Sequence, residues 1–432
     1  MDPNLLLKCG VNTSLTVGGL AIKIMKGLHT DNMSFKHYKN FMNNDEEKYN
    51  FIKLFKRGGI SHNNKCGKTT GVMSYDITSQ YPASMVYMEI PTGVSKWTTQ
   101  YNEREYGYYQ LKNTVFENAP VFKPIAETLE SGVLNWCTTD FIKSACVDSF
   151  MIKYLFKNCN LISFEVERGL VSKESVKGEY LFNKYVKTLF EEKAQQDILK
   201  ITNEHNPAYR ETIKLFLNAV TGKFVENVDL YEDNIFTINP NKGGVKNKTI
   251  NDNFTQTEGD TSVKQLNQYM GCGVMIYSYS KRLLFEYTNL LPNQSEDAIH
   301  VETDSVYFNR RHGEEFKDNV ETYKGSYPVK IGDALGNVKQ EKDEEGECHF
   351  LGKKFYQIGD IFKIKGIPMK TITEDGTFIN IVNQSIFERV YAGENVRVEY
   401  TTLKKNLFGK TYVSSHQCHR TINSHPKKYT EF

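Results

Sequence analysis

Four segments of the chain carry apolar residues at helical spacing, and the pattern predicts a helix in each. They are residues 14–28, 179–201, 208–224 and 269–291. Between the second and the third stands "TNEHNP", whose Asn and Pro are typical of one helix ending and another beginning. The last segment has few charged residues, so we expect that helix to be largely buried.

Shorter segments between these helices have patterns typical of strands or loops. Residues 71–78, "GVMSYDIT", predict a strand that stops at "SQYP", where Pro82 fits the first turn of a following helix. A second strand is expected within 161–171, "LISFEVERGLV". The polar stretch 226–264 predicts an exposed insertion or hairpin, and the acidic run 341–347, "EKDEEGE", predicts a solvated loop tip.

A third strand, residues 298–304, bears acids in an otherwise apolar pattern. Alternation along it places His300, Glu302 and Asp304 on one face. An edge strand that turns its charges to water has the same pattern. The acids of this strand alone therefore do not distinguish a functional acidic face from an ordinary solvated edge.

Charge and composition narrow the class of protein. The 432 residues suffice for several packed subdomains, and 54 Lys+Arg against 52 Asp+Glu give a net charge of +2. The overall field therefore does not indicate a nucleic-acid or acidic partner, and any basic surface must be local. Such surfaces are expected in residues 350–370 and 401–432, where a solvated face is the alternative.

Cysteine spacing and hydropathy bear on the compartment. Eight Cys stand without CxxC pairs, which argues against a disulfide scaffold or zinc finger and fits a reducing compartment. No apolar run approaches the ~20 residues of a membrane helix, and the first residues lack the blocks of a signal peptide. We therefore expect a soluble intracellular protein with no membrane partner, in a host compartment that the sequence does not indicate.

Asp76, which lies near the end of the strand 71–78, changes the interpretation of the acids, because two strand-borne carboxylates can then meet in one sheet. Mg²⁺ is commonly held by one or two carboxylates together with substrate phosphates. Two such ions about 4 Å apart can activate a hydroxyl and stabilise the leaving oxygen of a phosphoryl displacement. The pair Asp76 and Asp304 thus favours metal-dependent phosphoryl chemistry.

Two further segments could serve such a site. On the helix 208–224, Arg210, Lys214, Asn218 and Gly222 recur every four residues and form a polar stripe suited to a triphosphate and its base. A solvated helix face has the same spacing. The second segment, "LGKKFYQIG", offers basic and aromatic side chains to a phosphate backbone, with a basic strand edge as the alternative.

Five motifs resemble those of the family B DNA polymerases, specifically the protein-primed branch of phages, adenoviruses and linear plasmids. "DITSQYP" (76–82) resembles DxxSLYP, "KLFLNAVTGKF" (214–224) resembles KxxxNSxYGKF, and "VETDSVYF" (301–308) resembles the DTDS motif. "KKFY" (353–356) resembles KxY, and "KRGG" (56–59) resembles YxGG. Each motif is short, but five in the family's order make the resemblance specific.

The resemblance implies an α+β fold, a right-hand polymerase with an antiparallel palm sheet, helical fingers and a small thumb. It implies that Asp76 and Asp304 are catalytic and bind two Mg²⁺ ions, for which Mn²⁺ can substitute, with the Ile77 carbonyl as a backbone ligand. Ser79 and Lys214 would contact the triphosphate of a dNTP.

The remaining motif residues would bind the sugar, the base and the DNA. Asn218 would line the nucleotide pocket, and Tyr81 would lie under the sugar and exclude a 2′-hydroxyl. The DNA primer–template would contact Lys353, Lys354, Tyr356, Arg57, Gly58 and Gly59. Supporting positions are Glu302, Thr303, Thr221 and Gly222.

This chain departs from the family pattern in four respects. Glu302 replaces the first Asp of DTDS, Thr221 replaces an aromatic residue near the nascent base pair, and Lys56, beside Phe55, replaces the aromatic of YxGG. The fourth is an absence, because only about 50 residues precede "KRGG", where the family has a 3′–5′ exonuclease domain. Proofreading is therefore missing, supplied by a separate exonuclease chain, or lost because the chain is a fragment.

Motif positions predict a division of the chain, and the protein-primed branch implies a terminal protein as a further partner. We expect a remnant of the exonuclease-to-palm connection at 1–60, palm at 61–87, a first insertion at 88–187, fingers at 188–224, a second insertion at 225–264, palm at 265–359 and thumb at 360–432. Oligomeric state, fidelity and processivity are not indicated.

The expected reaction is addition of dNTPs to a primer 3′-hydroxyl in the replication of viral or plasmid-like DNA. Two alternatives remain. One is a non-catalytic DNA-binding subunit that needs a partner chain, and the other is a metal-dependent nuclease, which leaves the helix 214–224 without a role.

Overall fold

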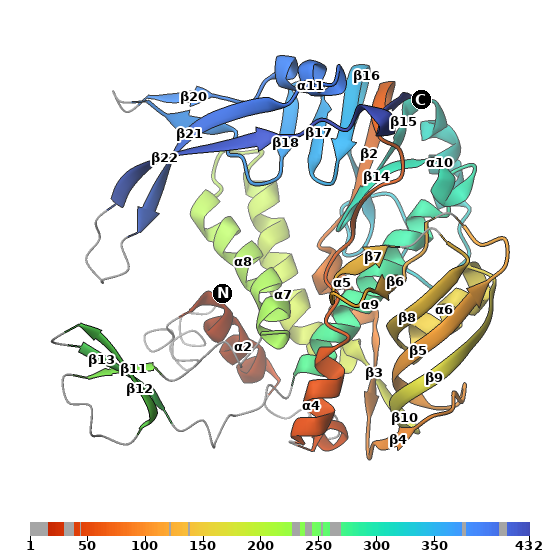
Figure 1. Cartoon of the computed structure of the whole chain (residues 1–432). Helices are drawn as coiled ribbons and strands as arrows, with labels where there is room; N and C mark the ends of the chain where they lie inside the picture. The colour runs from red at the N-terminus through yellow and green to blue at the C-terminus, as the bar shows by residue number, and fades with distance from the viewer. Residues whose placement is uncertain are drawn as a thin grey trace.

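The computed structural model describes residues 16–29, 39–43, 45–120, 122–136, 139–226, 234–237, 244–251, 254–259, 269–373, 377–405 and 413–432. Antiparallel sheets and helices alternate irregularly along the chain (Figure 1). The expected N-terminal remnant before residue 16, and much of the expected second insertion, lie outside the described residues.

An eight-stranded sheet forms the centre of the fold. Its strands lie in the order β1-β14-β15-β2-β16-β17-β18, and β23 pairs with β2 in parallel orientation. The strands are β1 Ser61–Asn63, β2 Gly67–Ile77, β14 Ala298–Glu302, β15 Ser305–Asn309, β16 Val338–Gly352, β17 Phe355–Ile358, β18 Ile361–Ile364 and β23 Thr430–Glu431.

The prediction for 341–347 is wrong, because this acidic run lies inside β16. Strand pairing joins Lys342 to Ser74 and Asp343 to Met73 across β2, with bulges between Gln340 and Lys342 and later in the strand. Most side chains of the run are exposed, as expected of charges on a strand segment whose other edge is unpaired. The acidic composition of residues 341–347 correctly indicated that they are exposed to solvent, but it could not indicate that their backbone is an extended strand.

Nine helices have defined bounds within the described ranges. They are α2 Val17–Leu28, α4 Glu46–Lys53, α5 Gln80–Tyr87, α6 Ser149–Asn158, α7 Gly178–Leu199, α8 Pro207–Phe224, α9 Met270–Thr288, α10 Gly313–Glu321 and α11 Gln384–Tyr391. All four helices expected from the apolar spacing are present, with ends that agree within three residues. No helix in the described ranges has the length and apolar content needed to cross a membrane.

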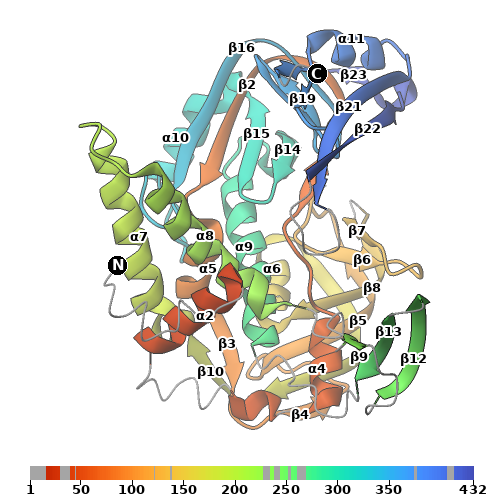
Figure 2. The ribbon, with the colours of Figure 1, turned by 90° about the vertical axis from the view of Figure 1, so that its left-hand side faces the viewer.

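Local sequence signals account for the start of helix α8. Helix α8 begins with Pro207 after an Asn206 cap, whose side chain accepts from the Tyr209 N–H at 3.0 Å. Its partner α7 runs alongside it (Figure 1). Helix α9 is almost entirely buried, as predicted, because it contacts both β15 and the lateral sheet (Figure 2).

The lateral sheet, in the order β4-β9-β5-β8, fills the region expected to be the first insertion. Its strands are β4 Lys96–Thr98, β5 Tyr106–Phe116, β8 Phe141–Asp148 and β9 Leu161–Ser172. Two ribbons adjoin it, β3 Glu89–Thr92 with β10 Glu174–Lys177 and β6 Ala126–Thr128 with β7 Leu134–Trp136. A separate three-stranded sheet comprises β11 Asn234–Thr237, β12 Gly244–Asn251 and β13 Phe254–Gly259.

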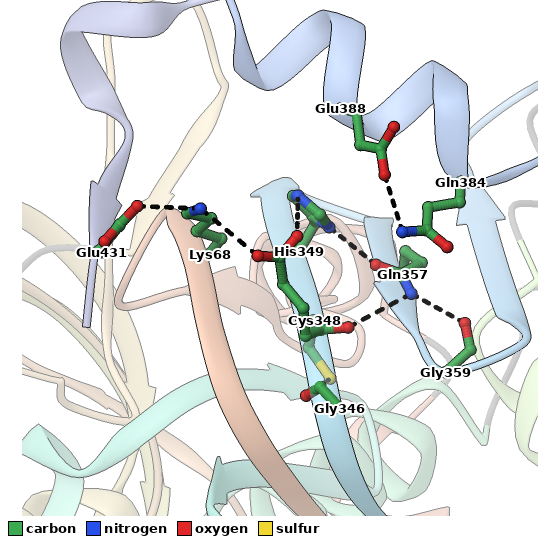
Figure 3. Close-up of polar contacts among 10 residues, drawn as sticks. Lys68, Gly346, Cys348, His349, Gln357, Gly359, Gln384, Glu388 and Glu431 are labelled. Atoms are coloured by element: carbon green, nitrogen blue, oxygen red, sulfur yellow. Dashed lines mark hydrogen bonds and ion pairs between the residues drawn. The ribbon is translucent and has the colours of Figure 1, made fainter.

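The C-terminal part has its own apolar core, built around Phe387 and Val390 of α11. Its ribbons are β19 Lys370–Ile372 with β20 Phe378–Asn380 and β21 Val396–Lys405 with β22 Val413–Ile422. Its Phe387 ring packs against His349 of β16 and Phe355 of β17, which joins this part to the central sheet. Within that sheet, Lys68 of β2 pairs with Glu347 of β16 at 3.4 Å and with Glu431 of β23 at 3.0 Å (Figure 3).

Candidate active site

Asp76 and Asp304 meet where β2 ends and β15 begins. Register places Asp76 opposite Ser305, and the Ile77 N–H donates to the Asp304 carbonyl at 2.8 Å. The two carboxyl groups hydrogen-bond to one another. Burial raises the pKa of both, and the neighbouring charge of Glu341 raises them further. The ionised pair is therefore unfavourable without a cation, as expected of groups that share a divalent metal.

Asp304 occupies a hairpin turn rather than a strand, which corrects the predicted strand 298–304. Strand β14 ends at Glu302, which pairs with Ser305, so Thr303 and Asp304 form a two-residue connection. Thr303 has a φ of 58°, a left-handed conformation that a β-branched residue adopts at a cost of about 1–3 kcal/mol. The alternation of faces therefore breaks at the turn.

The "KRGG" segment supports this strained turn. The Thr303 N–H donates to the Ile60 carbonyl at 2.6 Å. A Cβ atom on Gly59 would come within 2.7 Å of the Thr303 Cγ2, closer than real Cβ contacts. Gly59 is therefore required for close approach to the turn that carries Asp304.

Glu302 faces basic side chains, and it lines one cavity together with Asp304. Its carboxylate lies 2.8 Å from the Lys363 Nζ, 3.3 Å from the Lys354 Nζ and 3.5 Å from the His300 Nε2. Burial alone would raise the pKa of Glu302, but the hydrogen bonds from His300 and Lys363 and the lysine charges lower it to about 2. Glu302 thus stays ionised and orders two lysines.

A cavity of about 840 Å³ opens above the two aspartates. Asp76, Asp304 and Glu341 come from the central sheet and its β14–β15 turn, Asp197 comes from α7, and helices α7 and α8 supply most of the cations. Its polar lining comprises Asp76, Asp304, Glu341, Asp333, Lys339, Ser79, Gln80, Lys193, Asp197, Lys200, Arg210, Lys214 and Asn218. The volume suits a ligand of nucleotide size.

Helix α8 brings only part of its predicted stripe to the cavity. Lys214 and Asn218 are exposed on it, and the charge of Lys214 lowers the pKa of Asp76. Arg210 also lines the cavity but is paired with Asp197 at 2.5 Å. Gly222 is exposed outside the cavity lining, while Thr221 is buried.

Sequence reasoning missed the cations of helix α7. Lys193 lines the cavity, and burial lowers its pKa, as do the charges of Arg210 and Lys214, while Asp197 opposes them. A signal was available, since "TNEHNP" makes α7 and α8 an antiparallel pair, so polar residues near the end of α7 must face those at the start of α8.

The two motif residues at the start of α5 also border the cavity. Ser79 precedes the helix with a left-handed φ of 51°. The Tyr81 ring packs edge-on against Tyr277, with the ring centroids 5.5 Å apart. Burial raises the pKa of the Tyr81 hydroxyl, while the nearby backbone N–H of Gly59 lowers it.

The expected DNA-contacting residues fall into two groups. Lys353 is exposed, and Lys354 is partly exposed beside Glu302, so both can reach a phosphate. Tyr356 is buried instead, with its hydroxyl 3.4 Å from that of Tyr307. Arg57 is also buried, donating to the Thr128 Oγ1 at 2.6 Å, whereas Gly58 and Gly59 of the same segment are exposed.

No cluster of three or more His, Cys, Asp or Glu placed to hold a metal occurs within the described ranges. The pair Asp76 and Asp304 nevertheless fits Mg²⁺, which needs only one or two carboxylates when substrate phosphates complete its shell. The raised pKa of both carboxyls is the observation that supports this fit, because a bound cation would remove their repulsion.

Comparison with known proteins gives consistent matches. The family described as "DNA polymerase type B, organellar and viral" matches residues 4–321. A DNA polymerase of Kluyveromyces lactis is 24% identical over 404 residues, which cover 88% of this chain and 37% of that protein. The chain therefore spans little more than a third of the length of this relative.

Solved structures of Phi29 DNA polymerase share the fold at 16% sequence identity. The complex with primer-template DNA has a TM-score of 0.62, covering 97% of this chain and 70% of that chain. The complex with primer-template DNA and incoming nucleotide substrates has the same TM-score and covers 97% and 69%. The orthorhombic crystal form has a TM-score of 0.58 and covers 87% and 59%.

Proposed function

Because the chain belongs to the type B DNA polymerases of organelles and viruses, we propose that it adds deoxynucleotides to a primer 3′-hydroxyl under the direction of a DNA template. One observation carries the proposal. The partly buried pair Asp76 and Asp304 lines a cavity that is also lined by Lys214 and Asn218, which come from a segment far away in sequence. The cavity therefore brings together carboxylates that can bind metal ions and a lysine that can bind phosphates, in a volume that suits a nucleotide.

The residues of the chain divide the work of phosphoryl transfer. Lys214 holds the phosphates of the dNTP, Ser79 contacts them from the start of α5, and Asn218 borders the base. Asp76, Asp304 and the Ile77 carbonyl would hold two Mg²⁺ ions, or Mn²⁺ in their place. When bound, these ions supply charge stabilisation to the attacking and leaving oxygens. Catalysis rests on positioning and preorganised charge.

In this proposal the central sheet is the palm, α7 and α8 are the fingers, and the part around α11 is the thumb. The lateral sheet is the first insertion and β11 to β13 belong to the second. Lys354 contacts the primer strand, with Glu302 holding it in place. A terminal protein that offers a hydroxyl for initiation, and a separate chain that supplies exonuclease activity, are proposed partners.

A non-catalytic DNA-binding subunit is the second candidate, and a nuclease the third. The raised pKa of both aspartates favours the polymerase, because a chain that only bound DNA would gain nothing from two adjacent carboxyls in a partly buried position. The nuclease gives no role to the exposed Lys214 and Asn218 beside those acids.

Primer extension tests the proposal. The purified chain is incubated with a labelled primer–template, Mg²⁺ and one dNTP at a time. We expect extension only with the dNTP that complements the template, and none when EDTA removes the metal. Retained DNA binding without extension, with Mg²⁺ or Mn²⁺, would contradict the proposal and favour the non-catalytic subunit.

Tyr81 is expected to exclude ribonucleotides. Tyr81→Val removes the ring that packs against Tyr277 beside the cavity, and should lower the preference for dNTPs over rNTPs by about tenfold to a hundredfold. The measurement is the ratio of kcat/KM for dCTP and CTP opposite a template G. Tyr87→Val is the matched control, since Tyr87 is exposed on the same helix. An unchanged ratio in Tyr81→Val would rule out the role.

A further inference from the structure

Lys281 of α9 is a buried lysine that none of the motifs includes. Its side chain is only 6% exposed. The Nζ atom donates to the Arg57 carbonyl at 2.7 Å and to the Tyr277 carbonyl at 2.6 Å. One amine therefore ties the "KRGG" segment to a turn of helix α9 that lies next to it in space but more than 200 residues away in sequence.

The first contact leads to Tyr81 through the backbone. Arg57 is two residues before Gly59, whose N–H lies close enough to the Tyr81 hydroxyl to lower its pKa. The segment has little freedom, since the Arg57 side chain is anchored on Thr128 and the Ile60 carbonyl accepts from the catalytic turn. Between the Arg57 side chain and the Ile60 carbonyl, Lys281 anchors the backbone of the segment through the Arg57 carbonyl.

The second contact leads to Tyr81 through a ring. Tyr277, whose carbonyl accepts from Lys281, packs its side chain edge-on against the Tyr81 ring. Edge-on packing depends on the relative orientation of the two rings, so a shift of the helix turn at Tyr277 moves the surface on which Tyr81 rests. The hydroxyl and the ring of Tyr81 thus each have a neighbour held by Lys281.

Hydrogen bonding rather than charge accounts for these two contacts. Burial lowers the pKa of Lys281 to about 7; the charge of Asp148 opposes this effect, and those of Arg57 and Arg282 add to it. A neutral amine still has two N–H groups, enough for two carbonyl acceptors. The two carbonyls remain satisfied in either protonation state.

We propose that Lys281 is a positioning residue for sugar selection, holding the Gly59 backbone and the Tyr277 ring against Tyr81. The inference rests on the proposed function, in which Tyr81 is the residue that excludes a 2′-hydroxyl. Lys281 touches neither substrate nor metal in this scheme and acts only through Tyr81.

The test compares Lys281→Met with the wild-type chain in the discrimination assay. Met keeps the length and apolar stem of the side chain but donates no hydrogen bond. We expect the dCTP to CTP ratio of kcat/KM to fall by about tenfold, because a small misplacement of a site residue has large effects. Lys123→Met is the matched control: Lys123 is fully buried and donates to the Pro120 carbonyl at 3.0 Å, outside the lining of the cavity.

A double variant separates positioning from general damage. If Lys281 acts through Tyr81, the variant with both Lys281→Met and Tyr81→Val discriminates no worse than Tyr81→Val alone. A further, additive loss in the double variant would overturn the proposal. So would an unchanged ratio in Lys281→Met, or an equal fall in Lys123→Met.

Failure of the proposed function and misfolding of the variant are distinguished from failure of the role of Lys281. If the wild-type chain does not extend a primer, the proposed function fails, whereas extension with an unchanged ratio in the variant refutes only the role of Lys281. If thermal melting shows that Lys281→Met does not fold, Lys281→Gln replaces it. The shorter amide cannot bridge both carbonyls, so the same loss of discrimination is expected, and an unchanged ratio in Lys281→Gln would refute the role.

Discussion

Asp304→Asn is expected to lower primer extension by about a thousandfold or more while leaving primer–template binding largely intact. Asn keeps the shape of the side chain but removes the charge that completes the pair with Asp76. Extension is measured in single turnover with saturating dNTP, and binding by a salt titration of fluorescent primer–template. Phosphate contacts elsewhere on the chain should give both proteins the same salt dependence.

The same variant has a second readout that does not depend on activity. Burial raises the pKa of both aspartates and the charge of Glu341 raises it further, so the ionised pair destabilises the metal-free fold. Removing one charge should keep or raise the melting temperature without metal, and should abolish the stabilisation that Mg²⁺ gives to the wild-type chain. Asp343→Asn, on the same sheet but paired with Arg310, should keep the Mg²⁺ response. Equal loss of binding and extension would contradict the assignment of Asp304.

Local patterns were sufficient to predict the elements that carry the site. The helix that bears Lys214 was expected with nearly the observed bounds, and the strand that bears Asp76 was expected with nearly the observed end, although it begins four residues earlier, at Gly67. Apolar periodicity and the cap signal at Asn206 and Pro207 determine these elements locally. The two acids could be paired because Asp76 lies near the end of one expected strand and Asp304 at the end of another.

Contacts between distant segments could not be predicted in this way. Alternation assigned Glu302 to the face of Asp304, but the left-handed Thr303 ends the strand and sends the two carboxylates to different partners. Likewise, Arg57 looked available for DNA, whereas the structure buries it against Thr128. Both errors arise because turn geometry and tertiary packing override a local pattern.

Lys214→Met is expected to lower kcat/KM for dNTPs by about a hundredfold, chiefly through a higher KM. The ammonium is exposed on the cavity and close enough to Asp76 to lower that residue's pKa, so it lies where phosphates bridging to the metals would lie. Met retains the helix propensity and the apolar stem, and the fold should therefore be unaffected.

The matched control for that variant is Lys223→Met. Lys223 lies in the last turn of the same helix, outside the cavity lining, and pairs with Glu226. Steady-state kinetics on one primer–template should show an unchanged KM for this control and a raised KM for Lys214→Met. If both variants lost the same activity, the effect would come from the helix as a whole. If neither variant lost activity, the triphosphate would have to be held by the cations of α7 instead. Lys193 would then be the next residue to change, because it is a partly buried lysine of α7 that lines the cavity.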